Sequence, residues 1–458
     1  MGVVSLFTGA GGLDWGFHTL GFEVLAALDI KRDAAETFHT NFGIAVCDRP
    51  FLTRGCYSVC DISESAVHGG LPTPSIVIGG PPCQDFSVMR GVEQERGGIK
   101  TLRGKLYLQF ARYLAVLKPL AFVFENVPGL LSSNSGRDIS AILEDITNLE
   151  LLPNQWIRQY EAEPNRTPPP PEDLLSEARR GEIPSYHIVF SGVVDASWHG
   201  VPQRRKRLII IGFRRDLAVR MDHILAIEEA LAGSPVLRKY PLTSLEALEG
   251  ATLPELRDVY REIVAEYNGL FSGNDPVDDY LRLHKGDPRD PLFDQALEEH
   301  RAAIRLLGWE GTSLTVAPPD AFPDGSHALP RERPAVLARM HQIPPGENHE
   351  IVRGTEHEVE GRGFSLIYRR LHPLLPAYTV VAHGGGGTWG YHYRRSRSRL
   401  TNRERARLQS FPDTFQFVGK TSEVRSQIGE AVPPLLSLRI AEAVNNVLED
   451  VGEAEPAP

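Results

Sequence analysis

The stretch Val3-Val4-Ser5-Leu6-Phe7-Thr8-Gly9-Ala10-Gly11-Gly12 sets an apolar run directly before a glycine-rich turn. Residues 3–7 predict a buried strand, and a helical pattern over 13–20 follows the last glycine. Glycines between a first strand and a first helix let the backbone approach a ligand closely. Because Leu13 and Asp14 follow the last glycine, the turn is not the dinucleotide-binding G-x-G-x-x-G pattern. By itself it is as compatible with a plain tight turn as with a ligand loop.

Strand and helix patterns alternate along residues 1–150. Further candidates follow in turn, with strands at 23–28, 75–78 and 121–125 and helices at 32–42 and 106–117. Strand patterns return at 186–194 and 208–212. Alternating β and α elements predict an α/β fold with a doubly wound, mostly parallel, Rossmann-like sheet.

A second informative segment is Gly79-Gly80-Pro81-Pro82-Cys83-Gln84-Asp85-Phe86-Ser87, which follows the apolar run 76–78. Its prolyl-prolyl turn holds a cysteine just past the end of a predicted strand. A thiol on a loop at a strand end is where the nucleophile of an α/β enzyme belongs. A buried thiol without chemistry is the alternative that this segment leaves open.

Carboxylates follow two other predicted strands. Asp29 ends the second strand, and in a doubly wound fold an acid there takes a ribose hydroxyl. Asp61, with Ile62, supplies a carboxylate at a third strand end, suited to the amino group of an adenine. These positions predict a nucleoside-containing ligand, and the missing pyrophosphate fingerprint favours one that is not a dinucleotide.

A third carboxylate and a basic run flank two later strands. Glu125 follows the strand 121–125, and in an apolar setting its pKa would be raised so that it could donate a proton. A structural ion pair is an equally weighted alternative for it. Arg205 and Arg207 precede the strand 208–211. Because alternate residues of an extended segment point to one side, the two could converge on one anion or carbonyl.

The chain has 458 residues, a net charge of -10 and four cysteines. This length predicts two or three domains. No apolar run reaches membrane-spanning length, so we expect a cytoplasmic protein without a membrane partner. The cysteines are too sparse for a secreted disulfide framework and fit no standard zinc spacing, which favours buried or incidental thiols and no metal site.

Two basic clusters stand out against the acidic net charge. Residues 204–215 carry six cations, and 394–407 carry seven arginines against the single acid Glu404. A solvated surface is the plain interpretation. Two dense clusters in an acidic chain nevertheless favour a surface that faces phosphates.

The alternation breaks twice along the chain. Residues 163–184 include four consecutive prolines among charges, which predicts an extended or disordered surface insertion. The pattern is lost again after residue 213. The domains expected are therefore a first domain at 1–213, a second, irregular domain at 214–378, a return to the first domain with a C-terminal helix at 379–448, and a tail at 449–458.

Taken together, the motifs resemble those of cytosine-C5 DNA methyltransferases of the prokaryotic restriction–modification type. The matching blocks, in the family's order, are residues 7–12, 82–84, 103–106, 125–127, 203–207, 403–412 and 427–433. One such block is modest evidence, whereas the ordered set is specific. The resemblance covers residues 3–213 and about 369–445.

The resemblance implies a covalent mechanism. The Cys83 thiolate would add to C6 of cytosine, which makes C5 enamine-like and able to accept a methyl group from S-adenosylmethionine, leaving S-adenosylhomocysteine. Glu125 would protonate or hydrogen-bond N3, while Arg207, with Arg205, would hold the O2 side and lower the pKa of the thiol. The target carbon is hidden in a duplex, so the base must be flipped out, and the glycine-containing segment 87–105 would close over it.

The resemblance also implies the binding residues. Cofactor contacts are expected at Phe7, Gly9, Gly11, Gly12, Asp29, Ile30, Asp61, Ile62 and Leu106. Glu430 stands where the family usually has Asn, and an ionised Glu accepts hydrogen bonds but does not donate them. The region 214–378 would be the target-recognition domain for double-stranded DNA. DNA contacts are expected at Ser87, Arg394, Arg395, Arg397 and Arg399.

Three alternatives stay open. A branch of the family methylates tRNA, but it tends to have Thr where this chain has Ser87 and a small recognition segment. A catalytically inactive relative would act as a binding module, against which the intact Cys83, Glu125 and Arg207 argue. A dinucleotide oxidoreductase is disfavoured by the glycine pattern. If the chain is a DNA methyltransferase of this type, we expect a monomer with a cognate restriction endonuclease as a genetic partner.

Overall fold

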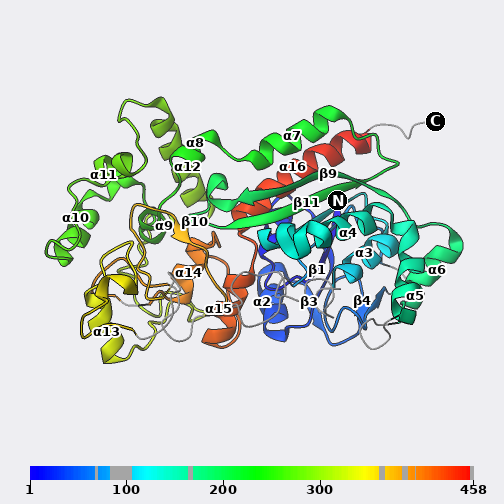
Figure 1. The fold of residues 1–458 in the computed structure, drawn as a ribbon, viewed down its shortest axis with the longest axis horizontal. Helices are drawn as coiled ribbons and strands as arrows, with labels where there is room; N and C mark the ends of the chain where they lie inside the picture. The colour runs from blue at the N-terminus through cyan, green and yellow to red at the C-terminus, as the bar shows by residue number, and fades with distance from the viewer. Residues whose placement is uncertain are drawn as a thin grey trace. The chain divides into compact units, whose positions relative to one another are not determined.

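The computed structural model describes residues 1–67, 71–82, 106–162, 169–359, 367–383, 390–397 and 399–453. The chain divides into two compact units (Figure 1). Unit 1 comprises Met1–Val194, Lys206–Ala232 and Ser437–Pro458, and unit 2 comprises Asp195–Arg205 and Gly233–Leu436. This division differs from the sequence-based boundaries, because residues 379–436 belong to unit 2 and only the C-terminal helix after them belongs to unit 1.

Unit 1 is built on a sheet that, within the described residues, has eight strands in the order β3-β5-β2-β1-β7-β8-β11-β9. The strands are β1 Gly2–Leu6, β2 Glu23–Asp29, β3 Ala45–Cys47, β5 Cys56–Val59, β7 Ile76–Gly79, β8 Ala121–Asn126, β9 Tyr186–Asp195 and β11 Lys206–Arg214. The pairs from β3 to β8 are parallel, and β11 is antiparallel to β8. The predicted α/β fold with a mostly parallel sheet is confirmed.

The strand order reverses beside β1, which pairs in parallel with both β2 and β7. In open α/β sheets, ligands bind outside the carboxyl ends of the strands at such a switch point. The glycine turn after β1 and the prolyl turn after β7 both leave the sheet at this edge. The fold therefore brings the two most informative sequence motifs to one edge of the sheet.

Helices cover both faces of this sheet. Those of unit 1 are α1 Gly12–Thr19, α2 Arg32–Phe42, α3 Leu106–Leu117, α4 Arg137–Thr147, α5 Leu152–Ala162, α6 Glu172–Arg180, α7 Met221–Ala232 and α16 Pro434–Glu453. Val4 and Leu6 of β1 share a buried core cluster with Phe110 of α3. Ser5 points to the opposite face, where it is 1% exposed and faces Asp14 of α1. The near-continuous apolar strands are thus explained by burial on both sides.

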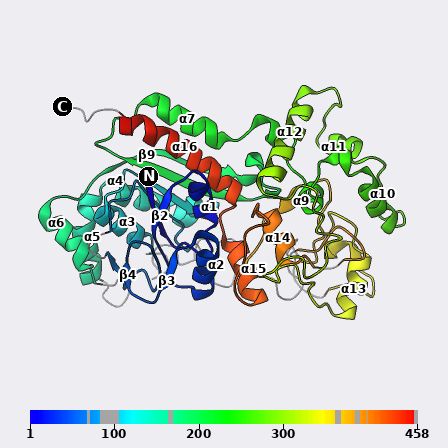
Figure 2. The same ribbon diagram turned by 180° about the vertical axis from the view of Figure 1, so that it is seen from behind.

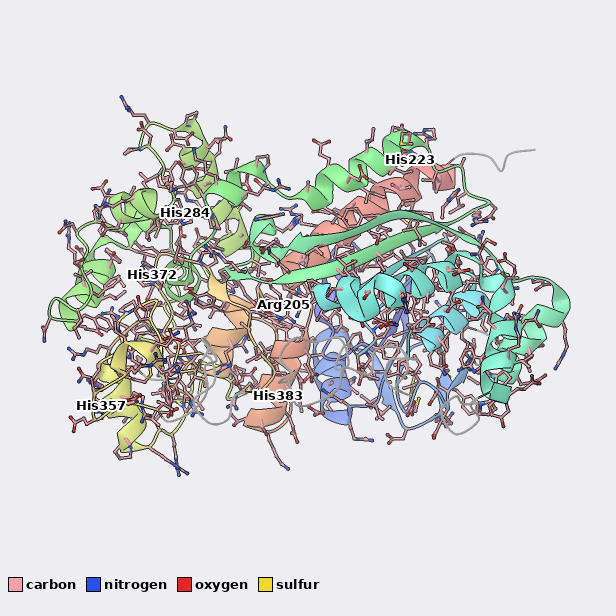
Figure 3. All side chains as sticks on the ribbon, in the orientation of Figure 1. Arg205, His223, His284, His357, His372 and His383 are labelled. Atoms are coloured by element: carbon pink, nitrogen blue, oxygen red, sulfur yellow. A yellow bond between two sulfur atoms is a disulfide. The ribbon has the colours of Figure 1, made fainter. Side chains whose placement is uncertain are left out.

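The C-terminal helix returns to the start of the chain. Ser437 Oγ of α16 donates a hydrogen bond to the carbonyl of Leu13 in α1. Figures 1 and 2 both show α16 side by side with α7. His223 of α7, labelled in Figure 3, lies with Nε2 3.2 Å from Asp450 Oδ2 of α16.

The expected proline-rich insertion is wrong in part. Residues 163–168 lie outside the described residues, but Glu172–Arg180 forms α6 instead of an extended or disordered segment. Glu172 and Asp173 occupy the first turn and Arg179 and Arg180 the last, so the charges complement the helix dipole. Buried Leu174 attaches the helix to the core cluster.

A disulfide also departs from the expectation of incidental thiols. Cys47 of β3 and Cys56 of β5 are joined, with their Cα atoms 6.0 Å apart. The two strands pair in parallel with Ala45 opposite Cys56, which brings the cysteines together across the ladder. Cys60 keeps a free thiol, whose pKa is raised to about 11, chiefly by burial.

Unit 2 is mostly helical and irregular. Its helices are α8 Pro235–Lys239, α9 Ser244–Glu249, α10 Arg257–Glu266, α11 Pro276–Leu283, α12 Pro291–Leu306, α13 Pro334–His341, α14 Asn402–Leu408 and α15 Thr421–Glu430. Strand β10 (Gln203–Arg204) pairs with β12 (Ala377–Tyr378), as β4 (Phe51–Leu52) pairs with β6 (Ala66–Val67) in unit 1. Short 3-10 helices lie at Pro128–Gly136, Leu149–Leu151, Ala196–His199, Leu253–Glu255 and His349–Val352. Among the described residues, no helix has both the length and the apolar character to cross a membrane.

A buried ion pair between α3 and α6 generates a stability prediction. The Arg112 side chain is 2% exposed, and its Nη2 lies 2.5 Å from Asp173 Oδ2 and 2.5 Å from the Ser65 carbonyl. Arg112→Met should lower the free energy of unfolding by about 3 kcal/mol because it leaves these acceptors without their donor. Urea denaturation measures the loss. The exposed pair Arg179–Glu172 on the same helix is the control, and Arg179→Ala should cost at most about 0.5 kcal/mol. Equal losses for the two variants would contradict the assignment.

Candidate active site

The glycine turn after β1 is held by hydrogen bonds to two neighbouring strands. The Gly9 N–H donates to Asp29 Oδ2 at 2.9 Å, and the Tyr57 hydroxyl donates to the Gly9 carbonyl at 2.9 Å. The Lys31 N–H donates to the other Asp29 oxygen at 3.0 Å. Each carboxylate oxygen has a further lone pair, so Asp29 can still accept from a ligand hydroxyl.

Glycine is required at the last position before α1. Gly11 is the N-cap with φ 93°, a left-handed conformation that L side chains rarely adopt. A Cβ there would stand 2.5 Å from the ring of Phe42 and 2.8 Å from that of Phe38. At Gly9, by contrast, a Cβ would meet nothing within 4 Å among the described atoms. The loop is therefore packed on one side and open on the other, as a ligand cradle requires.

The remaining candidate cofactor residues lie around this loop. Asp61 follows β5, and its Oδ1 accepts from the N–H and the hydroxyl of Ser63 at 2.9 and 2.6 Å. The adjacent Cys60 N–H donates to the Asp29 carbonyl at 3.1 Å, so the segments bearing the two carboxylates touch. Ile30 is 64% exposed, whereas Ile62 is 4% exposed. Phe7 has φ 54° at the start of the turn, Gly12 opens α1 and Leu106 opens α3.

Asp14 in the first turn of α1 is a further carboxylate that the motif analysis did not assign. It is 0% exposed, and within the described residues neither carboxylate oxygen makes a hydrogen bond of normal geometry. Because buried polar groups are normally hydrogen-bonded, this carboxylate stands out among the described residues. The burial of Asp14 could not be predicted from the sequence.

Glu125 and Arg207 form an ion pair across the antiparallel strands β8 and β11. Arg207 Nε lies 2.8 Å from Glu125 Oε1, and both side chains are 13% exposed. The expected apolar setting of Glu125 is therefore wrong, because a guanidinium contacts its carboxylate. The pairing follows from the register, in which Asn126 lies opposite Leu208.

The prolyl turn after β7 is fastened to the same place. A Cβ on Gly80 would stand 2.7 Å from Glu125 Oε2, so this position needs glycine for the backbone to approach the carboxylate. Asn126 Nδ2 donates to the Pro81 carbonyl at 3.2 Å. The backbone that leads to Cys83 therefore passes beside Glu125. Cys83 and Ser87 themselves lie outside the described residues.

Arg205 does not converge with Arg207 on one anion, which corrects the sequence expectation. Strand pairing breaks at Arg205, between β10 and β11, so the strict alternation is lost. Its side chain is 1% exposed and donates to the carbonyls of Val380, Gly429 and Ala431 at 2.9–3.0 Å. Arg205, labelled in Figure 3, thus joins separate segments of unit 2.

The arginines of 394–407 do not form the expected exposed surface. Arg394 contacts Glu262 and Glu266, Arg397 contacts Glu404, and Arg399 contacts Glu332. Arg403, Arg405 and Arg407 are at most 1% exposed. Arg395 differs, since its guanidinium donates to the carbonyls of His341 and Glu266. Sequence reasoning missed Glu262, Glu266 and Glu332 because they lie far away along the chain.

Glu430, where the family usually has Asn, ends α15 and is exposed. Its Oε1 accepts from the Ser426 hydroxyl at 3.1 Å, one helical turn earlier. Acceptance is the one hydrogen-bonding role open to an ionised Glu, and this contact uses it.

Arg205 and Arg207 are predicted to differ in stability tests. Arg205→Lys should lower the free energy of unfolding by about 3 kcal/mol, because one ammonium cannot replace a planar fork that spans three carbonyls. Arg207→Lys keeps a cation beside Glu125 and should cost about 1 kcal/mol or less. Urea denaturation of the two variants checks the difference. A stable Arg205→Lys protein would show that the three carbonyl contacts contribute little.

Comparison with known proteins identifies the family to which the chain is similar. The chain matches C-5 cytosine-specific DNA methylase over residues 1–152, 184–279 and 327–446. It is 44% identical to the DNA (cytosine-5-)-methyltransferase M.ApeKI of Aeropyrum pernix, covering 98% of this chain and 99% of the relative. It is 30% identical to the type II methyltransferases M.NgoFVII of Neisseria gonorrhoeae and M.BbvI of Brevibacillus brevis, covering 98% and 96% of this chain and 87% and 89% of theirs.

Among solved structures, the fold is similar to that of a candidate DNA modification methyltransferase encoded within an E. coli prophage. The TM-score is 0.55 at 22% identity, over 98% of this chain and 99% of the other. The order of the motifs, the reversal of strand order beside β1 and these matches agree. The chain belongs to the C-5 cytosine-specific DNA methylase family and is a DNA (cytosine-5-)-methyltransferase.

Proposed function

We propose that this enzyme methylates C5 of a flipped-out cytosine in a specific duplex DNA sequence, with Cys83 as the covalent nucleophile. The Cys83 thiolate adds to C6, C5 takes the methyl group, and loss of the C5 proton lets the thiolate leave. S-adenosylmethionine, the methyl donor general to the family, supplies an electrophilic methyl group when it is bound.

One observation carries the proposal. Gly80 lies against the Glu125 carboxylate, and Asn126 donates a hydrogen bond to the Pro81 carbonyl. The backbone that precedes Cys83 therefore lies beside Glu125 and its ion-pair partner Arg207. A nucleophile, a proton-handling carboxylate and a cation are the groups that addition to an electron-poor ring needs.

We assign complementary tasks to Glu125 and Arg207. Glu125 hydrogen-bonds or protonates N3, which draws electron density from C6 as the thiolate adds. Arg207 orients the Glu125 carboxylate through its 2.8 Å contact and offers its charge to the O2 side of the ring. Arg205 is left out of the catalytic set because its donors contact backbone carbonyls of unit 2.

The cofactor assignment follows the carboxyl ends of β1, β2 and β5. Asp29 binds the ribose, Asp61 binds the adenine amino group, and the exposed Ile30 packs on the base. Gly9, Gly11 and Gly12 allow the backbone to approach the ligand. Phe7, Ile62 and Leu106 complete the apolar lining. The open space beside Gly9 supports this assignment.

Unit 2 supplies the sequence reader in this proposal. The region after unit 1's last strand is long, as expected of a target-recognition domain that binds double-stranded DNA. Of the four arginines expected to bind DNA, we retain Arg395, because carboxylates engage the guanidiniums of Arg394, Arg397 and Arg399. Ser87 stays a proposed contact from the loop that closes over the base.

The type II relatives support a role in a restriction–modification system. We further propose that the enzyme acts as a cytoplasmic monomer with a cognate endonuclease as its genetic partner. Methylation at the recognition site should block cleavage by that endonuclease. A neighbouring endonuclease that cuts methylated and unmethylated DNA equally would count against this role.

The covalent step is tested by Cys83→Ser, which should abolish methyl transfer to duplex DNA from labelled S-adenosylmethionine. Glu125→Gln should slow transfer by about 10²–10⁴-fold, because the amide no longer exchanges a proton. Cys60→Ser is the matched control and should stay active, since burial raises the pKa of that thiol. Duplex DNA with 5-fluorocytosine should trap the wild type but not Cys83→Ser, because fluorine cannot leave as the proton does. Normal turnover by Cys83→Ser would overturn the mechanism.

Substrate class is tested in the same assay by offering tRNA beside duplex DNA. Bisulfite sequencing of the DNA product should give methylation at C5 and the recognition sequence together. Methylated tRNA with untouched DNA would favour the tRNA branch instead.

The role of Arg395 is tested by the salt dependence of DNA binding. Arg395→Ala should reduce the slope of log K against log salt concentration by about 1, the value for one phosphate contact. Arg394→Ala should leave that slope unchanged, because Glu262 and Glu266 already neutralise the Arg394 guanidinium. Fluorescence anisotropy on a labelled duplex measures both slopes. Unchanged slopes for both variants would remove Arg395 from the DNA interface.

A further inference from the structure

Tyr57 of β5 is a buried side chain to which the proposed function gives no role. It is 0% exposed, and its hydroxyl donates to the Gly9 carbonyl at 2.9 Å. Gly9 follows β1, and β2 lies between β1 and β5 in the sheet. The Tyr57 side chain therefore reaches past a whole strand to the turn at which we propose that the cofactor binds.

The strand pairing explains how Tyr57 reaches that carbonyl. Ser5 of β1 lies opposite Ala27 of β2, and Ala27 lies opposite Tyr57. Residues paired in this way project from the same face of a sheet. Because Ser5 and Ala27 are small, an aromatic ring can pass over β2. Phe38 of α2 packs against this ring, with the two ring centroids 5.2 Å apart.

Gly9 is held through its N–H as well as its carbonyl. The N–H donates to Asp29 Oδ2 at 2.9 Å, while the carbonyl accepts from Tyr57. Gly9 has φ 56°, and glycine has little conformational preference of its own. The two hydrogen bonds, one from β2 and one from β5, therefore set the orientation of this part of the turn.

Holding the Gly9 carbonyl also fixes the next N–H. The Gly9–Ala10 peptide bond is trans, so the Ala10 N–H points opposite to the carbonyl that Tyr57 engages. Backbone N–H groups in a turn that leads into a helix are donors suited to an anionic group of a ligand. Tyr57 thus controls the direction of one such donor without contacting the ligand.

We infer that Tyr57 is a positioning residue that sets the affinity of the glycine turn for the cofactor. This inference rests on the proposed cofactor site. The fit to a ligand comes from the turn itself, because a Cβ at Gly9 would meet nothing within 4 Å among the described atoms. Burial raises the pKa of the Tyr57 hydroxyl well above its usual value, so the group stays protonated and able to donate.

The test variant is Tyr57→Phe, which removes the hydroxyl and keeps the ring. Isothermal titration calorimetry of the whole protein should show about tenfold weaker binding of both S-adenosylmethionine and S-adenosylhomocysteine, because the turn is no longer held in the binding orientation. The KM for S-adenosylmethionine should rise by a similar factor. The kcat at saturating cofactor and the KM for duplex DNA should stay unchanged, since the hydroxyl touches no reacting atom.

Tyr186 of β9 supplies a matched control. It is also 0% exposed, and its hydroxyl donates to the Pro119 carbonyl at 2.8 Å. Its ring lies against Phe122, with the centroids 5.4 Å apart. Because Pro119 precedes β8, this bond lies at the edge of the sheet opposite to the glycine turn. Tyr186→Phe loses a hydrogen bond of the same kind and should bind both ligands as the wild type does.

Two further measurements separate positioning from general stability. Thermal unfolding checks that both variants fold. Amide hydrogen exchange of the free protein over residues 7–12 should be faster in Tyr57→Phe than in the wild type and unchanged in Tyr186→Phe.

The outcomes are distinguishable. Unchanged ligand affinity in Tyr57→Phe, or equal losses of affinity in Tyr57→Phe and Tyr186→Phe, would overturn the role of Tyr57 and leave the proposed cofactor site standing. A wild type that binds neither ligand would overturn the cofactor site and, with it, this inference.

Discussion

The parallel pairing of β1 with both β2 and β7 is the constraint on which the site depends. It brings the carboxyl ends of three strands to one edge, so the glycine turn and the prolyl turn leave side by side. Strand β8 pairs next to β7 and carries Glu125 to the same edge, and antiparallel β11 brings Arg207 opposite. Shifting one of these strands by one residue would turn its polar end residue to the other face of the sheet. The catalytic and cofactor groups are therefore products of one hydrogen-bonded register.

Unit 2 follows a different principle, because short helices and loops leave many carbonyls without a ladder partner. Buried arginines satisfy them. Arg370 is 0% exposed and donates to the carbonyls of Met340, Ile343, His392 and Arg394. Arg205 binds three carbonyls in the same manner. A guanidinium has five N–H donors in a planar fork, which lets one side chain join several segments that secondary structure does not connect.

The elements with strong periodicity were predictable, and β1, β2, β7, β8, β9, β11 and α2 lie where the pattern indicated. No strand range was predicted for β3 or β5, which are short. The errors have a common source. The arginines of 394–407 were predicted to form a basic surface because the acids that pair with them, such as Glu262 and Glu332, are distant in sequence. Glu125 was predicted to lie in an apolar setting because its partner Arg207 is on a strand far along the chain. The Cys47–Cys56 bond was missed because only strand pairing brings the two thiols together.

The amino-acid sequence by itself determined the order of strands and helices, the α/β class and the family, because periodicity and motif order are local properties that survive without coordinates. Tertiary structure decided which charges are neutralised, which arginine faces Glu125, which arginine binds backbone carbonyls, and that Asp14 is buried. These outcomes depend on contacts between residues far apart in the chain, where burial and the nearest opposite charge set the energy of an ionised group.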